Sequence, residues 1–255
     1  MVTGSGTGVG KTITAAALAA CALASGRTAA LVKPVQTGLE PGEPGDIDEV
    51  RRLTGLSDLH EYVRYAEALA PATAARRLGR PGPAIAELAD EICSLDDRDL
   101  VIVEGAGGAL VRLNAGHHTL LDLAAELTRR LAPGNSGAEH TVEILLTASC
   151  ELGTLHATAA TTRVIQQHGL AVGYLVITDW PAGPPTLVQR CNLGDLQDYS
   201  GAPLHGVIAE RAGQLDQEQF RRRAVRSLTP ALGGSLDAAG LSRLADDPVP
   251  ADDLR

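Results

Sequence analysis

Long hydrophobic runs are absent from this sequence of 255 residues. No apolar segment approaches the ~20 residues that a helix needs to span a bilayer, and the start of the chain carries neither a basic leader nor a cleavable apolar segment. Because 44% of the residues are hydrophobic, the chain can still fill a sizeable core. We therefore expect a soluble globular protein of the cytoplasm with no membrane partner.

Positive charge is in short supply. The sequence has 22 Lys and Arg residues against 31 Asp and Glu residues, which gives a net charge of −9. Since the phosphates of nucleic acids attract basic surfaces, this balance argues against a nucleic-acid partner. Any nucleotide must then be bound by local contacts and not by the electric field of the whole molecule.

Paired metal-ligand motifs are missing as well. The four cysteines are Cys21, Cys93, Cys150 and Cys191. They form no Cys-x-x-Cys pair and are typical of small buried apolar residues in a reducing compartment. The one histidine pair, His117-His118, follows a glycine and has no cysteine or carboxylate beside it. It indicates a solvated turn and not a metal site.

A glycine-rich segment, GSGTGVGKT, stands almost at the start of the chain, from Gly4 to Thr12. Its ending Gly-Lys-Thr is the phosphate-binding end of a P-loop, although the first glycine lies one residue further away than in the standard motif. A turn without a ligand is the alternative, but helix-forming residues follow at once, as a P-loop requires. Backbone N–H groups would hold a triphosphate, Lys11 its β and γ oxygens, and Thr12 an Mg²⁺ ion. The predicted nucleotide contacts here are Gly8, Val9, Gly10, Lys11, Thr12 and Ile13.

Only Met1, Val2 and Thr3 precede this loop, although a P-loop normally follows a buried central strand. At ~3.3 Å per residue, three residues span about 10 Å. We expect either that the natural start lies further upstream or that this strand is short and weak.

Short apolar segments alternate with helical patterns along the chain. The expected strands are 30–35, 100–103, 142–147, 172–177 and 204–208, and the expected helices are 11–24, 46–53, 84–94, 120–131, 155–168 and roughly 216–227. Each strand is apolar almost throughout, which is typical of strands covered on both faces of a parallel sheet. The sequence therefore predicts an α/β fold with a single P-loop-type, doubly wound, mostly parallel sheet flanked by helices.

No repeat or domain boundary interrupts this pattern. We expect one P-loop domain over residues 1–228 and an acidic, mobile tail over residues 229–255, where Ala, Asp, Gly and Pro dominate. The glycine- and proline-rich segment 133–137 is expected to form an exposed loop.

Two charged residues are expected to end apolar strands. Lys33 precedes Pro34-Val35-Gln36-Thr37-Gly38, and Glu104 leads into Gly105-Ala106-Gly107-Gly108. At the carboxyl edge of a parallel sheet both point into the crevice where α/β proteins bind ligands. The alternatives are a surface lysine for Lys33 and, for Asp46, which follows a Pro/Gly loop, a helix cap. If Asp46 faces the same crevice, Thr12, Asp46 and Glu104 complete an Mg²⁺ site.

Four motifs together resemble the dethiobiotin synthetases, the ATP-dependent ring-closing ligases of biotin synthesis. The motifs are GSGTGVGKT at Gly4 to Thr12, KPVQTG at Lys33 to Gly38, VEGAGG at Val103 to Gly108 and ELGTLH at Glu151 to His156. Their order and spacing agree with the family over roughly residues 1–225. The resemblance implies that 7,8-diaminopelargonate and CO₂ form a carbamate, that MgATP phosphorylates it, and that the neighbouring amine closes the ureido ring.

The resemblance also implies roles for individual residues. Lys11 and Lys33 would stabilise the charge on the carbamate and on the transferred phosphoryl group. Thr7 and Thr37 would donate hydrogen bonds to the carbamate or the substrate amine, and the backbone from Gly105 to Gly108 would position the diamine. The further nucleotide contacts that it implies are Asp46, Glu104, Gly105, Ala106, Gly107, Thr178, Asp179, Ala209 and Glu210.

A helix N-terminus is implied to bind the far end of the substrate. The family captures the substrate carboxylate at such an N-terminus, which the second subunit of a homodimer donates. The matching residues here are Gly153, Thr154, Leu155 and His156. Free N–H groups and a positive dipole end suit a carboxylate, whereas the residues by themselves favour an ordinary turn between strand and helix.

The chain departs from the commoner family form at several positions, and rival functions remain open. Thr178-Asp179 stands where the base-binding stretch of the family often shows Asn-Asp. Gly6 and Gly8 stand where Asp and Glu are usual, and His156 stands where Asn is usual. Partition or switch ATPases carry a signature lysine at the place of Gly6, and cobyrinate-type ligases need a cysteine nucleophile that no cysteine here matches. An inactive relative is a third alternative, although both lysines and all three proposed metal ligands are present.

Overall fold

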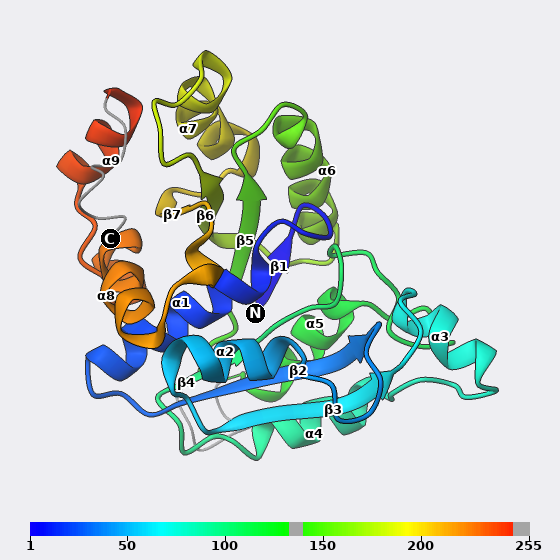
Figure 1. Cartoon of the computed structure of the whole chain (residues 1–255). Coiled ribbons are helices and arrows are strands. Elements are labelled where there is room, and N and C mark those ends of the chain that lie inside the picture. Colours follow the sequence, from blue (N-terminus) through cyan, green and yellow to red (C-terminus); the bar gives the residue numbers. More distant parts are fainter. Residues whose placement is uncertain (133–139, 247–255) are drawn as a thin grey trace.

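A sheet of parallel strands forms the centre of the molecule in the computed structural model, which describes residues 1–132 and 140–246. Its strands are β1 Val2–Gly4, β2 Ala29–Thr37, β3 Leu59–Tyr65, β4 Leu100–Val103, β5 Ile144–Ser149, β6 Val172–Trp180 and β7 Leu204–Ala209. They form a four-stranded group in the order β1-β5-β6-β7 and a three-stranded group in the order β3-β2-β4. Figure 1 shows the two groups meeting near the N-terminus, strongly turned relative to each other.

Strand β1 joins the two groups. Val2 forms a parallel bridge with Glu104, and the backbone N–H of Gly105 donates to the carbonyl oxygen of Val2 at 3.0 Å. On its other side β1 pairs with β5 through all three of its residues. The strand that carries the glycine-rich loop is therefore central, and although it is short, Val2 and Thr3 are at most 1% exposed.

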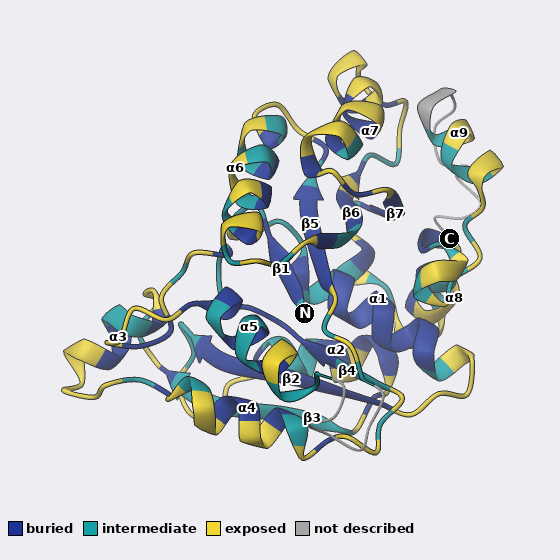
Figure 2. Cartoon of the chain, turned by 180° about the vertical axis from the view of Figure 1, so that it is seen from behind, coloured by how far each residue is buried: buried dark blue, intermediate teal, exposed yellow. Residues whose placement is uncertain are grey.

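Helices cover both faces of this sheet. One layer holds α1 Lys11–Ala24, α2 Asp46–Thr54 and α8 Gln217–Ser227, and the other holds α4 Ile85–Cys93, α5 Leu120–Arg130, α6 Thr154–Gln167 and α7 Leu187–Ser200. Strand β5 shows the division, because Leu145 packs in one core cluster with α1 and Leu146 packs in another with α5, α6 and α7. Figure 2 shows how completely α1 is buried. The predicted doubly wound α/β fold is confirmed.

The expected end of a strand at Lys33 is wrong, because β2 continues to Thr37. The carbonyl oxygen of Val32 accepts the N–H of Glu104. The backbone nitrogen of Pro34, two residues later, therefore also points toward the side of β4. There β4 has already ended at Val103. The missing N–H of the proline therefore costs the sheet no hydrogen bond.

Two larger elements were not expected. Strand β3 carries charged residues along its length (LHEYVRY) and lies at the edge of the sheet. Helix α7 buries polar residues, Gln189, Asn192 and Ser200, so it shows no apolar stripe. Cys191 on α7 is exposed and corrects the expectation that all cysteines are buried, whereas His117 and His118 are exposed as predicted.

Part of the segment expected to be a tail is helical. Two elements follow α8, the 3-10 turn Pro230–Leu232 and α9 Ala238–Asp246, and α9 contacts α7. Whether this end of the chain is mobile stays a prediction. The expected loop at 133–137 and the last residues, 247–255, lie outside the described part. Among the helices of the described part, none is long and apolar enough to cross a membrane.

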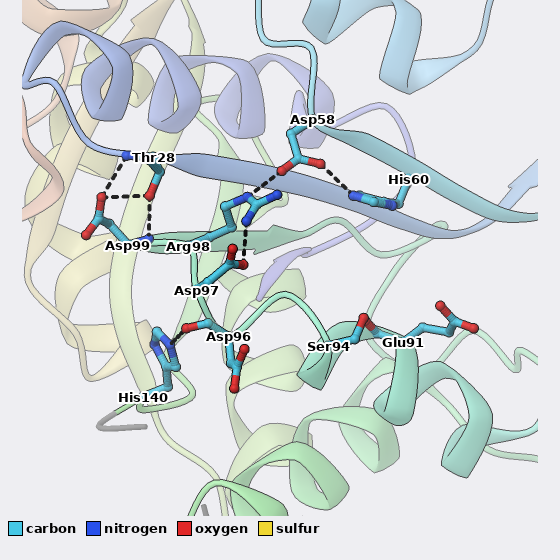
Figure 3. A network of polar contacts seen from close by, with 10 residues as sticks. All are labelled: Thr28, Asp58, His60, Glu91, Ser94, Asp96, Asp97, Arg98, Asp99 and His140. Carbon is cyan, nitrogen blue, oxygen red and sulfur yellow. Dashed lines mark hydrogen bonds and ion pairs between the residues drawn. The ribbon is translucent and has the colours of Figure 1, made fainter. Parts of the chain in front are cut away.

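The amino ends of β2, β3 and β4 are tied together by polar side chains (Figure 3). Asp99 accepts hydrogen bonds from the N–H and the hydroxyl of Thr28 at 2.7 and 2.8 Å. Arg98 pairs with Asp58 at 2.6 Å and also with Asp97. Because all these strands are parallel, this network marks the edge of the sheet opposite the carboxyl ends.

Candidate functional site

The glycine-rich loop connects the carboxyl end of β1 to the start of α1. Gly8 and Gly10 have φ values of 75°, and α1 begins at Lys11 directly after the left-handed Gly10. The Lys11 side chain folds back over the loop, and its Nζ donates to the carbonyl oxygen of Gly6 at 2.8 Å. Such a loop turns its backbone donors toward one point, as an anion site requires.

Close packing fixes the shape of this loop. The Thr178 hydroxyl, at the end of β6, donates to the carbonyl oxygen of Val9 at 3.0 Å. A Cβ on Gly10 would lie 2.8 Å from Cγ2 of Thr178, and a Cβ on Gly4 would lie 2.5 Å from Cγ2 of Val9. Side chains at these two positions would displace the loop.

The predicted residues Lys33, Asp46, Glu104 and Thr12 form one connected group. The Nζ of Lys33 lies 2.5 Å from Oδ2 of Asp46 and 2.7 Å from Oε1 of Glu104. The Thr12 hydroxyl donates to the same Oε1 at 2.8 Å. Thr12 belongs to α1, Asp46 to α2 and Lys33 to β2, and Glu104 directly follows β4. The group therefore assembles only in the folded sheet.

Burial governs the charges of this group. Lys33 is 3% exposed and Glu104 is 1% exposed. Burial by itself would lower the pKa of Lys33, but the carboxylates of Glu104 and Asp46 outweigh it and raise that pKa. Burial raises the pKa of Glu104 against the opposing pull of Lys33, and burial lowers the pKa of Lys11. The positive charge of Lys33 is thus held inside the protein by its two acidic partners.

The structure decides between the alternatives for Lys33 and Asp46. Lys33 is not a surface lysine, because its side chain is buried. The cap of α2 is Gly45, whose N–H donates to Oδ2 of Asp48 at 2.9 Å. Asp46 is the next residue, and its carboxylate turns to Lys33.

The oxygens of this group suit a hard divalent cation. Oε2 of Glu104 is buried without a hydrogen-bond partner. The carboxylates of Asp46 and Glu104 are linked through Lys33, and the hydroxyl of Thr12 donates to Glu104. Mg²⁺ is usually bound by one or two carboxylates together with substrate phosphates. No group of three or more His, Cys, Asp and Glu residues that could hold a metal ion occurs in the described part of the chain. A cation here would therefore bind weakly by itself and more tightly when a phosphate adds further oxygen ligands.

The loop after Glu104 lies against the start of the glycine-rich loop. Gly107 has a φ of 70°, and a Cβ there would lie 2.8 Å from Cγ2 of Val111 and 3.5 Å from Oγ1 of the exposed Thr7. A Cβ on Gly108 would lie 3.7 Å from the carbonyl oxygen of Gly4. Beside these loops is a cavity of about 320 Å³. Its lining residues are Ser5, Gly108, Ala109, Leu110, Val111, Ala160, Thr161 and Val164.

The remaining predicted nucleotide contacts lie at the ends of β6 and β7. Ala209 pairs with Trp180, and Oε1 of Glu210 accepts the N–H of Ala182 at 3.1 Å. Thr178 is buried against the glycine-rich loop, whereas Asp179 is exposed and has a φ of 55°. The side chain of Ile13 packs against the core, so only its backbone can face a phosphate.

The helix N-terminus assigned to the substrate carboxylate makes no polar contact with the lysines in the described part of the chain. Gly153 has a φ of 94° and precedes α6, with Gly153 and His156 exposed and Thr154 buried. Among the described residues, no hydrogen bond or ion pair joins this segment to the group around Lys33.

Two features of the site were missed in the sequence. Gln36 is 6% exposed. Its Oε1 accepts the N–H of Asp46 at 3.2 Å, and its Nε2 donates to the carbonyl oxygen of Thr37 at 3.1 Å. It thus links the two predicted contacts, and its place within KPVQTG was the available signal. Lys11 and Lys33 are also the only lysines of the chain, a rarity that a simple count would have shown.

Comparisons with known proteins identify the family of this chain. The family described as an AAA domain matches residues 1–219. The ATP-dependent dethiobiotin synthetase BioD of Frankia casuarinae is 48% identical over 239 residues, which cover 93% of this chain and 94% of that protein. The enzyme of the same name from Streptomyces coelicolor is 47% identical with the same coverage. The solved cell-division ATPase MinD of Pyrococcus furiosus is similar at a TM-score of 0.49 and 20% identity over 100% of this chain and 98% of that one, a likeness that supports no functional argument. The chain belongs to the dethiobiotin synthetase family.

Proposed function

We propose that this protein is an ATP-dependent cyclo-ligase that converts 7,8-diaminopelargonate, CO₂ and ATP into dethiobiotin, ADP and phosphate. Its close relatives carry the name of this activity. The single observation that supports it most is the second buried lysine, Lys33, which the fold holds against Glu104 and Asp46 beside the glycine-rich loop. A nucleotide-binding loop alone needs no such lysine, whereas transfer of a phosphoryl group to an anionic carbamate does.

The proposed reaction has three steps. One substrate amine attacks CO₂ and loses a proton, which gives the carbamate. A carbamate oxygen then attacks the γ-phosphorus, and ADP leaves. The second amine finally attacks the carbonyl carbon of the mixed anhydride and loses a proton, and phosphate leaves as the ureido ring closes. Lys11 and Lys33 stabilise the negative charge in the first two products, and hydrogen bonds from Thr7 and Thr37 orient the carbamate.

The cation, the assembly and the location belong to the same proposal. Thr12, Asp46 and Glu104 would hold Mg²⁺, which supplies neutralising charge to the β- and γ-phosphates when bound. The protein would act as a homodimer in which Gly153 to His156 of one subunit receive the substrate carboxylate of the other. Gly153 and His156 are exposed, so this helix end is accessible to a partner subunit, which supports this view. We place the enzyme in the cytoplasm, where ATP is supplied.

A direct assay tests the function. Purified protein is incubated with diaminopelargonate, bicarbonate and MgATP, and dethiobiotin and ADP are quantified by mass spectrometry. We expect both products in equal amounts and no ADP without the diamine. ATP turnover that ignores the diamine would contradict the proposal and would favour a switch-type ATPase.

A further inference from the structure

The ammonium group of Lys33 lies where two carboxylates converge. Its Nζ is 2.5 Å from Oδ2 of Asp46 and 2.7 Å from Oε1 of Glu104, and the side chain is 4% exposed. The Thr12 hydroxyl shares Oε1 of Glu104 with it. These are the same residues that would hold a divalent cation, so lysine and cation depend on one set of oxygens.

Both positive charges cannot bind these oxygens closely at the same time. Like charges a few ångströms apart repel strongly inside a protein, where water screens them little. The repulsion doubles when one partner is divalent. In addition, each carboxylate oxygen that ligates a cation loses most of its attraction for the ammonium. A cation that binds Asp46 and Glu104 must therefore move Lys33 away from at least one of them.

The surroundings offer the displaced ammonium a second place. Nζ of Lys33 lies 3.4 Å from the carbonyl oxygen of Gly105, the first residue of the loop proposed to position the diamine. The four-carbon stem of lysine is flexible enough to follow such a move. Oε2 of Glu104, buried without a partner, remains available to the cation.

We propose that Lys33 and the divalent cation compete for the Asp46–Glu104 pair, so that arrival of the metal–nucleotide releases Lys33 toward the substrate loop. The inference rests on the function and the cation site proposed above. It makes Lys33 a counter-ion that stabilises the acidic pair until the nucleotide arrives. The lysine would then meet the carbamate only when the phosphoryl donor is in place.

Binding of Mn²⁺ without nucleotide tests the competition. The loss of the electron paramagnetic resonance signal of hydrated Mn²⁺ gives the affinity of the wild-type protein and of two variants. Lys33→Met frees the pair and should tighten Mn²⁺ binding by about tenfold or more. Lys11→Met is the matched control, because it removes an equal charge whose Nζ contacts Gly6 and not the carboxylates. Equal tightening in both variants, or none in Lys33→Met, would overturn the proposal.

A measurement on the wild-type protein covers the case in which Lys33→Met does not fold. Since the chain has two lysines, protein labelled with ¹³C at the lysine ε-carbon gives two signals, and Lys11→Met identifies the one from Lys33. We expect the Lys33 signal to shift with saturating MgADP but not with saturating ADP alone. An identical Lys33 signal in both samples would contradict the exchange. Dethiobiotin formation is measured separately, so an inactive protein that still shows the exchange would contradict the proposed function alone.

Discussion

Gly10 is subject to two constraints at once. Its φ of 75° belongs to the left-handed region, and a Cβ would lie 2.8 Å from Cγ2 of Thr178. Replacement by alanine must shift the loop that carries Lys11. We expect Gly10→Ala to weaken nucleotide binding by roughly tenfold or more, measured by calorimetry with ADP.

Gly26 shares the backbone constraint of Gly10 but not its close packing, so it serves as a control. Gly26 has the same φ of 75°, but a Cβ there would find no atom within 4 Å, and it lies after α1, away from the loop. Gly26→Ala should cost about 1 kcal/mol of stability through backbone strain and leave ADP affinity unchanged. If Gly10→Ala binds ADP as well as Gly26→Ala does, the packing against Thr178 is not what shapes the loop.

Lys33 is expected to act on the reaction and not on nucleotide binding. Its Nζ contacts Asp46, Glu104 and the carbonyl oxygen of Gly105, and among the described residues no hydrogen bond or ion pair joins it to the glycine-rich loop. Lys33→Ala should therefore lower kcat by orders of magnitude, as the loss of an electrostatic group does, while ADP affinity changes little. Steady-state kinetics of dethiobiotin formation and calorimetry give the two quantities.

A remote arginine serves as the control for this substitution. Arg98→Ala also removes a positive charge paired with two carboxylates, but at the opposite edge of the sheet (Figure 3). It should leave kcat as in the wild type. Near-normal kcat in Lys33→Ala would show that the electrostatic role assigned to Lys33 is wrong.

At the scale of the element, the start of α2 positions Asp46. The N–H of Gly45 donates to Oδ2 of Asp48, and Oε1 of Gln36 accepts the N–H of Asp46. Loss of the Asp48 carboxylate should fray this first turn and cost about 1 kcal/mol of unfolding free energy. Because Asp46 moves with the turn, Asp48→Ala should also weaken the binding of MgADP relative to ADP.

Helix α8 offers a matched capping variant. Asp216 caps it by accepting the N–H of Gln219 at 2.8 Å. Asp216→Ala should cost a similar free energy in urea unfolding but leave the effect of Mg²⁺ on ADP binding unchanged. If both variants alter that effect equally, general destabilisation explains it and the cap of α2 does not position Asp46.

The strands and helices differ in how well the sequence predicts them. Continuous apolar segments predicted β2, β4, β5, β6 and β7, because strands buried on both faces need such residues. Strand β3 and helix α7 were not predicted, since an edge strand tolerates charged residues and α7 buries polar side chains. Asp46 could be assigned to a cap or to a ligand from the sequence. Only the fold, which brings a residue of α2 against one of β2, separates the two.

For the whole molecule, the sheet gathers the phosphate loop, both lysines and the acidic pair at one edge. In the described part of the chain, the start of α6 makes no hydrogen bond or ion pair with the group around Lys33. The start of α6 carries exposed Leu152 (87%) and exposed His156. If a partner subunit supplies this helix end, as proposed, each complete site needs residues of two chains. Sequence motifs alone cannot reveal this division, because they do not record which copy of the chain contributes each residue.

Mixing two defective variants tests this shared site. Lys33→Ala lacks the lysine, and His156→Glu places a negative charge where the substrate carboxylate should bind, whereas His156→Gln, its neutral control, should retain activity. In a homodimer with shared sites, an equal mixture re-equilibrated from the subunits forms about half mixed dimers, each with one intact site. Dethiobiotin formation should therefore return to about a quarter of the wild-type rate. A mixture no more active than the mean of its two parents would show that each chain binds the carboxylate by itself.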